Sequence, residues 1–547
     1  MQRRSLLRTL AASGAIGTSI GVGASTTNLV QSVQAQSDSG WQQQQRLVAP
    51  DAEPEDGFGY KIELSYEGKT ALIVPVDANK PTVSPVYVYN IQNNEWTFQQ
   101  RLTDPDGDSE SLFGYDIALS GDGSTALVGA PEAKPKSKTG TIQPRSGVVH
   151  VFSRNGGTWS LKQELNTDIS SSEDFLGTAV SISNSGDTAL IGGIQRMSSN
   201  KCIVFTRNDD GWTEEDRFTS NDVEDGDRFG SEVALAGDGS TAIVSAPRKK
   251  ISESDPYKIG SVYVFKRDSD TWSQQKKLTG DPDQQWGTFG ISVSLSDNGT
   301  TALIGSKSTN AENSGLEGYE ESAYVFSHNN DEWLQDRILV TDSNESQQNN
   351  LLPVSLSDSG TTAVVADVYE NEFTGSVYVF SKVGGTWSQQ QKLTVNINES
   401  GLFGSAVSVS GDGNTILAGA SYENTEDGDQ AGATYVFGNN GDSSNDNQVS
   451  LSNVQIDNTN INSPDTHTLS FTVSGLSPDG AKDDIRIALP EEVTVEKVKE
   501  VNSPDTSYDV TIQQETNPIK LYVDPSGPSN PVKMDIKLQL KLSANNI

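Results

Sequence analysis

The sequence contains very few of the residues that build the common metal, redox and nucleic-acid sites. Among its 547 residues there are one cysteine and three histidines. One cysteine excludes a disulfide framework, a cysteine-based zinc site and an iron–sulfur cluster, and three histidines leave little for histidine-based catalysis. Lysine and arginine number 39 against 74 acidic residues, a formal net charge of −35. Because a phosphate backbone requires a basic surface, this charge argues against DNA or RNA as a partner.

Long hydrophobic runs are also missing beyond the N-terminal region. No run of 18 apolar residues follows it, so no transmembrane segment is expected there. Only 33% of the residues are hydrophobic, yet there are 50 glycines and 8 tryptophans. That combination fits a turn-rich β protein better than an acidic disordered chain. An excess of acids is also typical of adaptation to molar salt, where the screening length falls to about 3 Å.

Residues 1–35 resemble a twin-arginine signal peptide, which directs the export of folded proteins. Arg3-Arg4 is followed by a pair of leucines, and residues 9–25 are small, apolar and uncharged. Residues 33–35 fit a small-residue cleavage site, which predicts a mature chain that starts near Gln36. A retained N-terminal anchor is the alternative. We therefore expect an extracellular or cell-surface protein.

Three sequence triplets are compatible with this localisation. They are candidate glycosylation acceptors of the Asn-x-Ser/Thr type at Asn298, Asn344 and Asn398. Such triplets often arise by chance. The single cysteine, Cys202, lies far from the signal, which argues against a lipid anchor at the N-terminus.

The middle of the chain consists of seven repeats. The clearest copy begins at Phe113-Gly114, passes through a Gly-Asp-Gly turn and reaches Gly-Ala-Pro at residues 129–131. One position of the repeat recurs at intervals of 53–63 residues and gives the register of the seven copies: Ala71, Ala126, Ala189, Ala242, Ala302, Ala363 and Ile416. Repeats of this length, built of short apolar segments between glycine turns, predict the blades of a β-propeller.

Each repeat predicts four strands, which we name a to d in chain order. Strand d begins at a tryptophan, but the last repeat ends at Phe437 without such a strand. Residues 41–47, ahead of the first repeat, are an isolated strand that begins at a tryptophan. We therefore predict a seven-bladed β-propeller over residues 36–437, in which the N-terminal strand 41–47 closes blade 7. Ring closure removes the open sheet edges that invite aggregation.

The Phe-Gly … Gly-Ala-Pro pattern resembles the FG-GAP repeat of integrin α-subunit propellers and of many exported microbial proteins. The segments Gly-Ser-Val-Tyr-Val-Phe (260–265) and Thr-Trp-Ser (271–273) are most similar to the exported microbial branch. The resemblance covers about residues 41–437. It implies an integrin-like propeller fold, and it is weak for function because one fold hosts many functions.

In the integrin-like version of the repeat, the a–b turn often binds calcium. Here the four ligand positions of blade 2 hold one carboxylate among small residues: Ala118, Ser120, Asp122 and Ala126. Calcium takes six to eight oxygen ligands, several of them from carboxylates. We therefore expect no cofactor; calcium remains possible, but most of the a–b turn ligands are absent.

The connections d–a and b–c leave the propeller on one face, where the long and variable segments lie. Acidic runs precede several Phe-Gly motifs on this face. The weak metal-site candidates are Asp104, Asp106, Asp108, Asp222, Asp225 and Asp227. Hydrated surface acids of a salt-adapted protein are the simpler interpretation. Variable loops on a rigid scaffold are, however, where binding sites usually lie.

The C-terminal region predicts a second domain. Residues 438–448 are a polar linker. About seven short alternating segments follow within residues 449–547. This number of strands in about 100 residues is typical of an immunoglobulin-like β-sandwich. A spacing or docking role is expected for it.

These observations favour an exported, non-enzymatic recognition or adhesion protein with a protein or glycan partner at the cell surface. The propeller is expected to be monomeric. One alternative is an extracellular hydrolase or lyase that acts on polysaccharide with carboxylates in the central channel. A cluster of inward acids with a basic or aromatic partner at the channel mouth would favour it. A passive envelope component is the third possibility.

Overall fold

The computed structural model describes residues 33–34, most of 40–439, and seven strands between residues 450 and 542. Outside the description lie 1–32, 35–39, 77–83, 94, 109, 136–144, 167–174, 194–200, 251–257, 281–286, 310–318, 330–331, 341–351, 398–400, 426–427, 440–449 and the segments between and after the C-terminal strands. Nearly all of the predicted signal peptide and linker, and both Asn344 and Asn398, therefore lie outside it. The chain divides into two compact units, of which one spans Gln43–Gly438.

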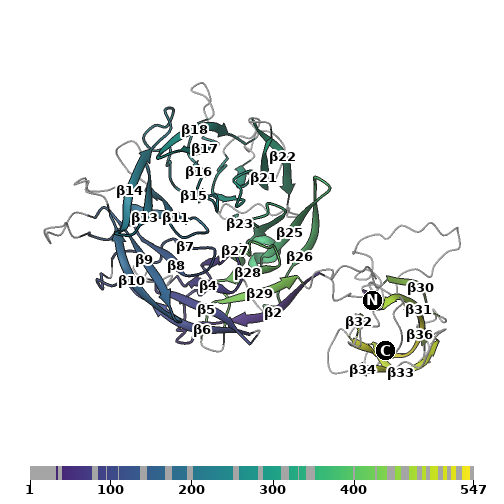
Figure 1. The fold of residues 1–547 in the computed structure, drawn as a ribbon. Coiled ribbons are helices and arrows are strands. Elements are labelled where there is room, and N and C mark those ends of the chain that lie inside the picture. Colours follow the sequence, from purple (N-terminus) through teal and green to yellow (C-terminus); the bar gives the residue numbers. More distant parts are fainter. Residues whose placement is uncertain are drawn as a thin grey trace. The chain divides into compact units, whose positions relative to one another are not determined.

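This unit is a ring of seven four-stranded antiparallel sheets, which confirms the predicted seven-bladed β-propeller (Figure 1). Within each blade the strands follow one another from the centre outward. Blade 1 comprises β3 (Lys61–Leu64), β4 (Thr70–Val74), β5 (Val86–Gln92) and β6 (Glu95–Leu102). Blade 2 comprises β7 (Ile117–Leu119), β8 (Thr125–Ala130), β9 (Val148–Asn155) and β10 (Thr158–Leu165). Blade 3 comprises β11 (Leu176–Ile182), β12 (Thr188–Gly193), β13 (Cys202–Asn208) and β14 (Gly211–Phe218).

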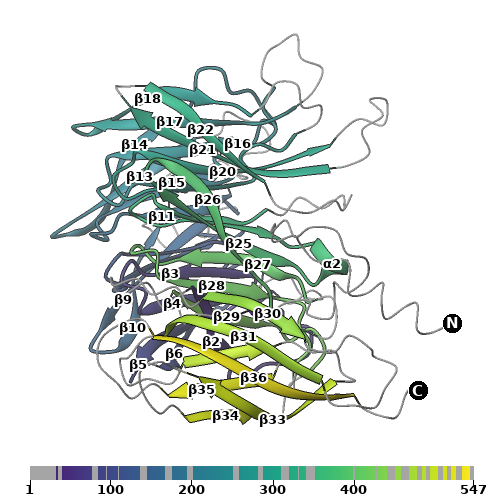
Figure 2. The same ribbon diagram turned by 90° about the vertical axis from the view of Figure 1, so that its right-hand side faces the viewer.

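Blades 4 to 6 repeat the same meander. Blade 4 comprises β15 (Val233–Leu235), β16 (Thr241–Ala246), β17 (Ser261–Asp268) and β18 (Thr271–Leu278). Blade 5 comprises β19 (Ser292–Leu295), β20 (Thr301–Thr309), β21 (Tyr319–Asn329) and β22 (Glu332–Val340). Blade 6 comprises β23 (Val354–Leu356), β24 (Thr362–Asp367), β25 (Ser376–Val383) and β26 (Thr386–Leu393). A short helix, α2 (Glu370–Phe373), lies in the b–c connection of blade 6. Figure 2 shows the ring from the side, with α2 on the face from which this connection leaves.

Blade 7 is built from both ends of the propeller sequence. Its strands, from the outside inward, are β2 (Trp41–Leu47), β29 (Ala433–Asn439), β28 (Thr415–Ala420) and β27 (Phe403–Val409). Trp41 is 4% exposed and Leu47 is also buried. The outer strand of the last blade is thus supplied by the N-terminal strand, as the isolated tryptophan strand predicts.

The phenylalanine of each intact Phe-Gly motif packs between two aromatic residues of strand c. The Phe58 ring centroid lies 5.6 Å from that of Tyr87 and 6.1 Å from that of Tyr89, both edge-on. Side chains two residues apart on a strand share one face, so they form a slot, and each such aromatic pair contributes about 0.5–1.5 kcal/mol. Glycine must follow, because a Cβ at Gly114 would lie 2.6 Å from the carbonyl oxygen of Ser84 in the neighbouring blade.

Among the described residues, three pairs of neighbouring outer strands are joined by reciprocal hydrogen bonds. In each, a glutamine four residues after the tryptophan of one blade bonds both backbone groups of the next tryptophan. Gln100 Nε2 donates to the Trp159 carbonyl at 2.9 Å, and the Trp159 N–H donates to Gln100 Oε1 at 2.8 Å. The same pairs join Gln45 to Trp96 and Gln163 to Trp212. A glutamine amide suits this position because it offers both a donor and an acceptor.

The second unit contains two four-stranded antiparallel sheets. One has the order β30 (Ser450–Ile456), β31 (His467–Leu476), β36 (Val532–Leu542), β33 (Val493–Asn502). The other has the order β1 (Val33–Gln34), β32 (Asp483–Ile487), β35 (Ile519–Asp524), β34 (Asp509–Gln513). Among the described residues, no helix is both long and apolar enough to cross a membrane.

Candidate functional site

Charged side chains from three blades meet at the centre of the ring. They occupy the second position after Phe-Gly, which holds Lys61 in blade 1, Asp116 in blade 2 and Glu232 in blade 4. Lys61 Nζ lies 3.2 Å from Asp116 Oδ1. The pKa of Lys61 is raised, chiefly by Asp116 and further by Glu232. Because blades 1 and 4 are three places apart in the ring, Lys61 and Glu232 can influence each other in this way only across the axis.

Asp116 is the best anchored of these groups. Its Oδ2 accepts a hydrogen bond from the Val180 N–H of blade 3 at 2.8 Å, while Oδ1 faces Lys61. Side chains from blade 1 and backbone from blade 3 therefore hold one carboxylate of blade 2. Each oxygen of the Asp116 carboxylate therefore accepts one hydrogen bond, from Lys61 Nζ or from the Val180 N–H, and the two bonds together fix its orientation.

Two glutamates of this group have strongly raised pKa values. Burial raises the pKa of Glu63 to about 8, and the charges of Asp116 and Asp358 add to the effect. Burial likewise raises the pKa of Glu232 to about 7, although Lys61 acts in the opposite direction. At neutral pH Glu63 is therefore mostly protonated, and Glu232 is close to half protonated. We call Lys61, Glu63, Asp116 and Glu232 the axial cluster.

Two tyrosines lie next to the axial cluster on the loop-rich face. Tyr60 and Tyr115 immediately precede Lys61 and Asp116 in their blades, and they are 38% and 46% exposed. Burial raises the pKa of Tyr115, and the charge of Lys61 opposes that rise. The same face also carries two arginines. Burial lowers the pKa of Arg228, and the nearby Arg248 lowers it further, while Tyr115 acts in the opposite direction.

The a–b turns close the other end of the axis. Asn184 Nδ2 donates to Asp297 Oδ1 at 2.8 Å and to Asp358 Oδ2 at 3.2 Å. These three residues belong to blades 3, 5 and 6, so their hydrogen bonds cross the centre of the ring. Burial raises the pKa of Asp358 to about 6, which the hydrogen bond from Asn184 opposes and the charge of Asp297 reinforces. We call these three residues the axial plug.

Glycines make room for the axial plug. The turn position that these side chains occupy holds a glycine in three other blades: Gly121, Gly237 and Gly411. A Cβ at Gly237 would lie 1.5 Å from Asp297 Oδ1, and one at Gly411 would lie 2.0 Å from the Tyr66 ring. Glycine in three of the turns therefore lets the turns approach one another.

The acidic run before blade 2 is held by hydrogen bonds within its own loop. Asp104 Oδ1 accepts from the Asp106 N–H at 2.8 Å, and Asp104 Oδ2 accepts from Ser111 Oγ at 2.5 Å. Asp108 accepts from the Glu110 N–H at 3.1 Å. Among the residues that the structure describes, no three His, Cys, Asp or Glu side chains are arranged to hold a metal ion.

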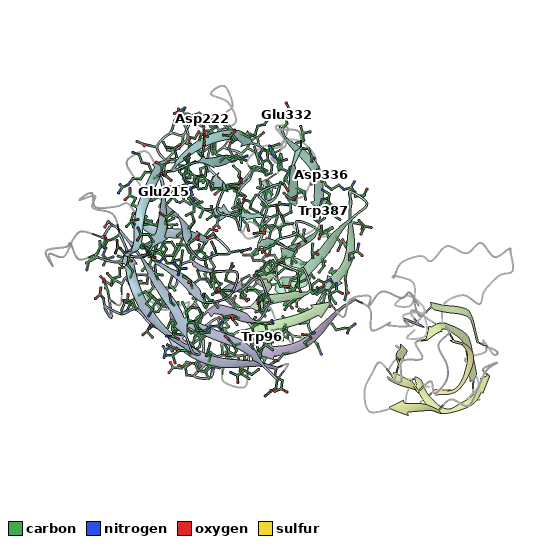
Figure 3. All side chains as sticks on the ribbon, in the orientation of Figure 1. Trp96, Glu215, Asp222, Glu332, Asp336 and Trp387 are labelled. Carbon is green, nitrogen blue, oxygen red and sulfur yellow. The ribbon has the colours of Figure 1, made fainter. Side chains whose placement is uncertain are left out.

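The acidic run before blade 4 is paired with lysines. Asp222 Oδ2 lies 2.7 Å from Lys277 Nζ, and the buried Asp227 lies 3.1 Å from Lys249 Nζ. Burial works against ionisation of Asp222, but hydrogen bonds from Lys277 and Ser220 hold its pKa at about 2. Figure 3 shows Asp222 at the periphery of the ring, far from the axis. Asp225 is exposed.

The a–b turn carboxylates and the described glycosylation candidate are also engaged locally. Asp122 Oδ1 accepts from Ser120 Oγ at 2.7 Å and from the Ser124 N–H at 2.9 Å. Asn298 Oδ1 accepts in the same way from Ser296 Oγ and from the Thr300 N–H. Each side chain thus stabilises the turn in which it lies.

His150 and Cys202, which both lie in strands c, are buried. His150 is 2% exposed, and its ring centroid lies 5.4 Å from that of Phe113, in the slot that tyrosine forms elsewhere. Cys202 is fully buried, and burial raises the pKa of its thiol.

Sequence reasoning did not single out the axial cluster. Its members are four acids and bases among 113 such residues, and no spacing brings blade 1 close to blade 4. A usable signal was nevertheless present, because the aligned position is small or uncharged in the other four blades: Ala179, Ser292, Pro353 and Ala406. Charge at an aligned position that is otherwise small points to the axis of a propeller.

Three stretches of the chain match the FG-GAP repeat family, at residues 96–152, 212–265 and 387–437. No curated protein matches the sequence. Similar solved structures include U3-55K, which is 8% identical with a TM-score of 0.44 over 72% of this chain and 98% of its own. The RRP9 WD40 repeats are 8% identical with a TM-score of 0.44, over 74% and 100%. The periplasmic gluconolactonase PpgL of Pseudomonas aeruginosa is 14% identical with a TM-score of 0.39, over 61% and 85%. Similarity at this level bears on neither ligand nor activity.

Proposed function

Given that this chain is an FG-GAP repeat β-propeller, we propose that it is an exported, non-enzymatic recognition protein of the exported microbial branch. Its binding site is the axial cluster together with the loop-rich face around it. The observation that carries the proposal is the gathering of Lys61, Asp116 and Glu232 from three blades at one end of the axis. The plug at the other end gives the two ends different chemistry.

The partner that suits this site is a glycan that carries carboxylate groups. The exposed rings of Tyr60 and Tyr115 offer flat apolar faces beside polar groups, the usual composition of a small-ligand site. Arg228 and Arg248 lie close enough together for one to lower the pKa of the other. A pair of arginines in a chain with a net charge of −35 is a local positive region that suits a carboxylate.

Binding can be tested with acidic and neutral polysaccharide fragments and the full chain in molar salt. The double variant Tyr60→Ala/Tyr115→Ala should weaken binding of the acidic fragment at least about tenfold, which is the loss of about 1.4 kcal/mol. Tyr66→Ala is the matched control, because Tyr66 is 45% exposed but lies at the plugged end. Equal affinities of the two variants would place the binding site elsewhere.

A carbohydrate-active enzyme on the same site is the second candidate. It is favoured by a carboxyl group with a pKa of about 7, Glu232, on the same axis as Asp116, which accepts hydrogen bonds from the Val180 N–H and from Lys61 Nζ. A pair of carboxyl groups in unlike surroundings is what acid and base roles in glycoside cleavage require. Chain-shortened products that disappear in Glu232→Gln would establish this enzyme in place of a recognition protein.

Export and salt adaptation complete the proposal. The twin-arginine pattern supports export, and the C-terminal unit, which the sequence predicts to be a β-sandwich, would serve as a spacer from the surface. The acidic excess predicts that melting temperature rises from low to molar KCl, because screening at about 3 Å relieves repulsion among surface acids. A melting temperature independent of KCl concentration would exclude the salt adaptation but not the binding site.

A further inference from the structure

Four basic residues lie close together in the loops of blade 4. One belongs to the d–a connection and three belong to the b–c connection: Arg228, Arg248, Lys250 and Lys258. Within the described part of the chain, none of the four forms an ion pair with a carboxylate. In a chain with 39 basic and 74 acidic residues, such a group is a local region of positive charge. We call it the blade 4 basic cluster.

A buried ion pair holds the two arginines of this cluster side by side. Asp227 and Lys249 are both buried, and Lys249 Nζ lies 3.1 Å from Asp227 Oδ2. They are the sequence neighbours of the two arginines, which are exposed. The Arg248 N–H also donates to the Asp227 carbonyl oxygen at 3.2 Å. The two loops are therefore fixed to each other beneath Arg228 and Arg248, which we call the arginine pair.

Lys250 and Lys258 form the other half of the cluster, and we call them the lysine pair. They are partners in an isolated antiparallel bridge, so their side chains lie on the same face of it. Arg248 is exposed, Lys249 is buried and Lys250 is half-exposed. Arg248 and Lys250 therefore face outward on either side of a buried residue, with Cα atoms at most about 7 Å apart. This distance is of the order of one sugar unit.

The repeat itself does not require this positive charge. The residue before the Phe-Gly motif is Arg228 in blade 4, but the aligned residue is uncharged in five other blades: Gly57, Leu112, Phe175, Thr288 and Leu402. The position of Arg248 holds Glu132, Tyr369 and Tyr422 in blades 2, 6 and 7. Because ring closure proceeds without these cations elsewhere, the cluster is a property of blade 4 and is available for binding.

The blade 4 basic cluster adjoins the axial cluster through Tyr115. This tyrosine is 46% exposed and precedes Asp116 of the axial cluster. It also lies close enough to Arg228 to raise the pKa of that arginine, against burial and the charge of Arg248. A sugar that packs on the Tyr115 ring can therefore continue toward blade 4.

Building on the proposed function, we propose that this face binds an acidic polysaccharide along its length. One carboxylate is held by the arginine pair, and the carboxylate of a neighbouring sugar is held by the lysine pair. A guanidinium group binds a carboxylate through two parallel hydrogen bonds, whereas an ammonium group acts as a point charge with three donors. Two adjacent subsites select a polymer that carries acid on successive units over one with a single acidic sugar. Lys249 and Asp227 are positioning residues for the arginine pair.

The test is calorimetry with the full chain in molar KCl, where a screening length of about 3 Å leaves only direct contacts. The probes are digalacturonate and the same disaccharide with one carboxylate reduced to an alcohol, so that they differ in charge and not in size. The parent chain should bind the diacid at least about tenfold more tightly, because only the diacid fills both subsites.

Two variants separate the subsites. Lys250→Gln/Lys258→Gln should abolish the preference for the diacid, whereas Arg228→Gln/Arg248→Gln should weaken the binding of both disaccharides. Lys266→Gln/Lys276→Gln is the matched control, because it removes the same charge from two exposed lysines on the outer strands of the same blade. The control should bind both disaccharides as the parent chain does.

The outcomes distinguish this inference from the proposed function. Equal affinity of the parent chain for the two disaccharides, or a diacid preference that survives in the lysine variant, would overturn the second subsite and leave the proposed function in place. Binding of neither disaccharide would overturn both. If poly-glutamate displaced digalacturonate at equal carboxylate concentration, the partner would be an acidic protein and the polysaccharide would be overturned.

Discussion

The repeated residues have different roles in the outermost and in the innermost strands of the blades. On the outside, the repeated residues make the contacts, as when Gln100 bonds both backbone groups of Trp159. On the inside, the repeated residues pack between blades, while the positions that face the axis differ from blade to blade. Lys61, Asp116 and Glu232 occupy an aligned position that is alanine in two other blades.

This difference indicates which positions of a repeat protein carry the charged side chains that can form a site. Glutamine recurs at the position of Gln100 in several blades, because the interface between outer strands repeats around the ring. Positions that face the axis or the loops are free to vary, and charge accumulates there. Arg228 follows the same rule, since the aligned residue is uncharged in five other blades.

The largest expected effect tests the outer ring at its closure. Trp41→Ala should destabilise the fold by about 3–5 kcal/mol, as truncation of a buried aromatic does, because Trp41 is 4% exposed in the strand that completes blade 7. Trp159→Ala, at a site that is 3% exposed within blade 2, is the reference. Urea unfolding of both variants measures the loss of unfolding free energy that each substitution causes.

Equal losses of unfolding free energy would mean that the N-terminal strand contributes as much to stability as an internal strand does. A stable chain after deletion of residues 41–47 would contradict the closure.

A medium effect tests the hydrogen-bonded pairs between outer strands. Gln100→Ala removes both bonds to Trp159 and should cost about 1–3 kcal/mol, since it leaves a backbone donor and acceptor partly buried. Lys276→Ala is the control, because lysine at the same repeat position has no acceptor and cannot make the reciprocal pair. In thermal unfolding, Gln100→Ala should lower the melting temperature more than Lys276→Ala does. Equal decreases would show that the two hydrogen bonds to Trp159 contribute nothing beyond side-chain packing.

The smallest effect tests the inner strands through pH. The folded chain holds a proton on Glu63 up to about pH 8, whereas an unfolded glutamate loses it near its ordinary pKa of 4.5. Between these values the folded state binds more protons, so stability falls as pH rises. Glu63→Gln should therefore raise the melting temperature at pH 8 and leave it nearly unchanged at pH 4.5.

The control for this experiment is Glu67→Gln, in the exposed a–b turn of the same blade. It should shift the melting temperature little and equally at both pH values. The same pH dependence in Glu63→Gln and in the parent chain would show that water reaches Glu63 freely.

Much of the propeller can be predicted from its sequence because its signals are local and recur. The Phe-Gly motif, the glycine turns and the strand that begins at Trp41 predict the number of blades and the closure of the ring. For the acids before blades 2 and 4, metal binding stays a prediction, and local spacing could not show that Asp222 faces Lys277 or that Asp227 faces Lys249. Local spacing likewise could not bring the axial cluster together, since its members come from distant blades.

The sequence by itself determined the fold class, the seven blades and the charge that argues against a nucleic-acid partner, because each depends on pattern or composition. Only the tertiary structure decided which acids share a site. Closing the ring brings residues more than 100 positions apart, such as Lys61 and Glu232, to a common axis, where the charge of Asp116 raises the pKa of Lys61 and burial raises that of Glu232. Proximity of this kind is a property of the closed ring, and no segment of the chain carries it alone.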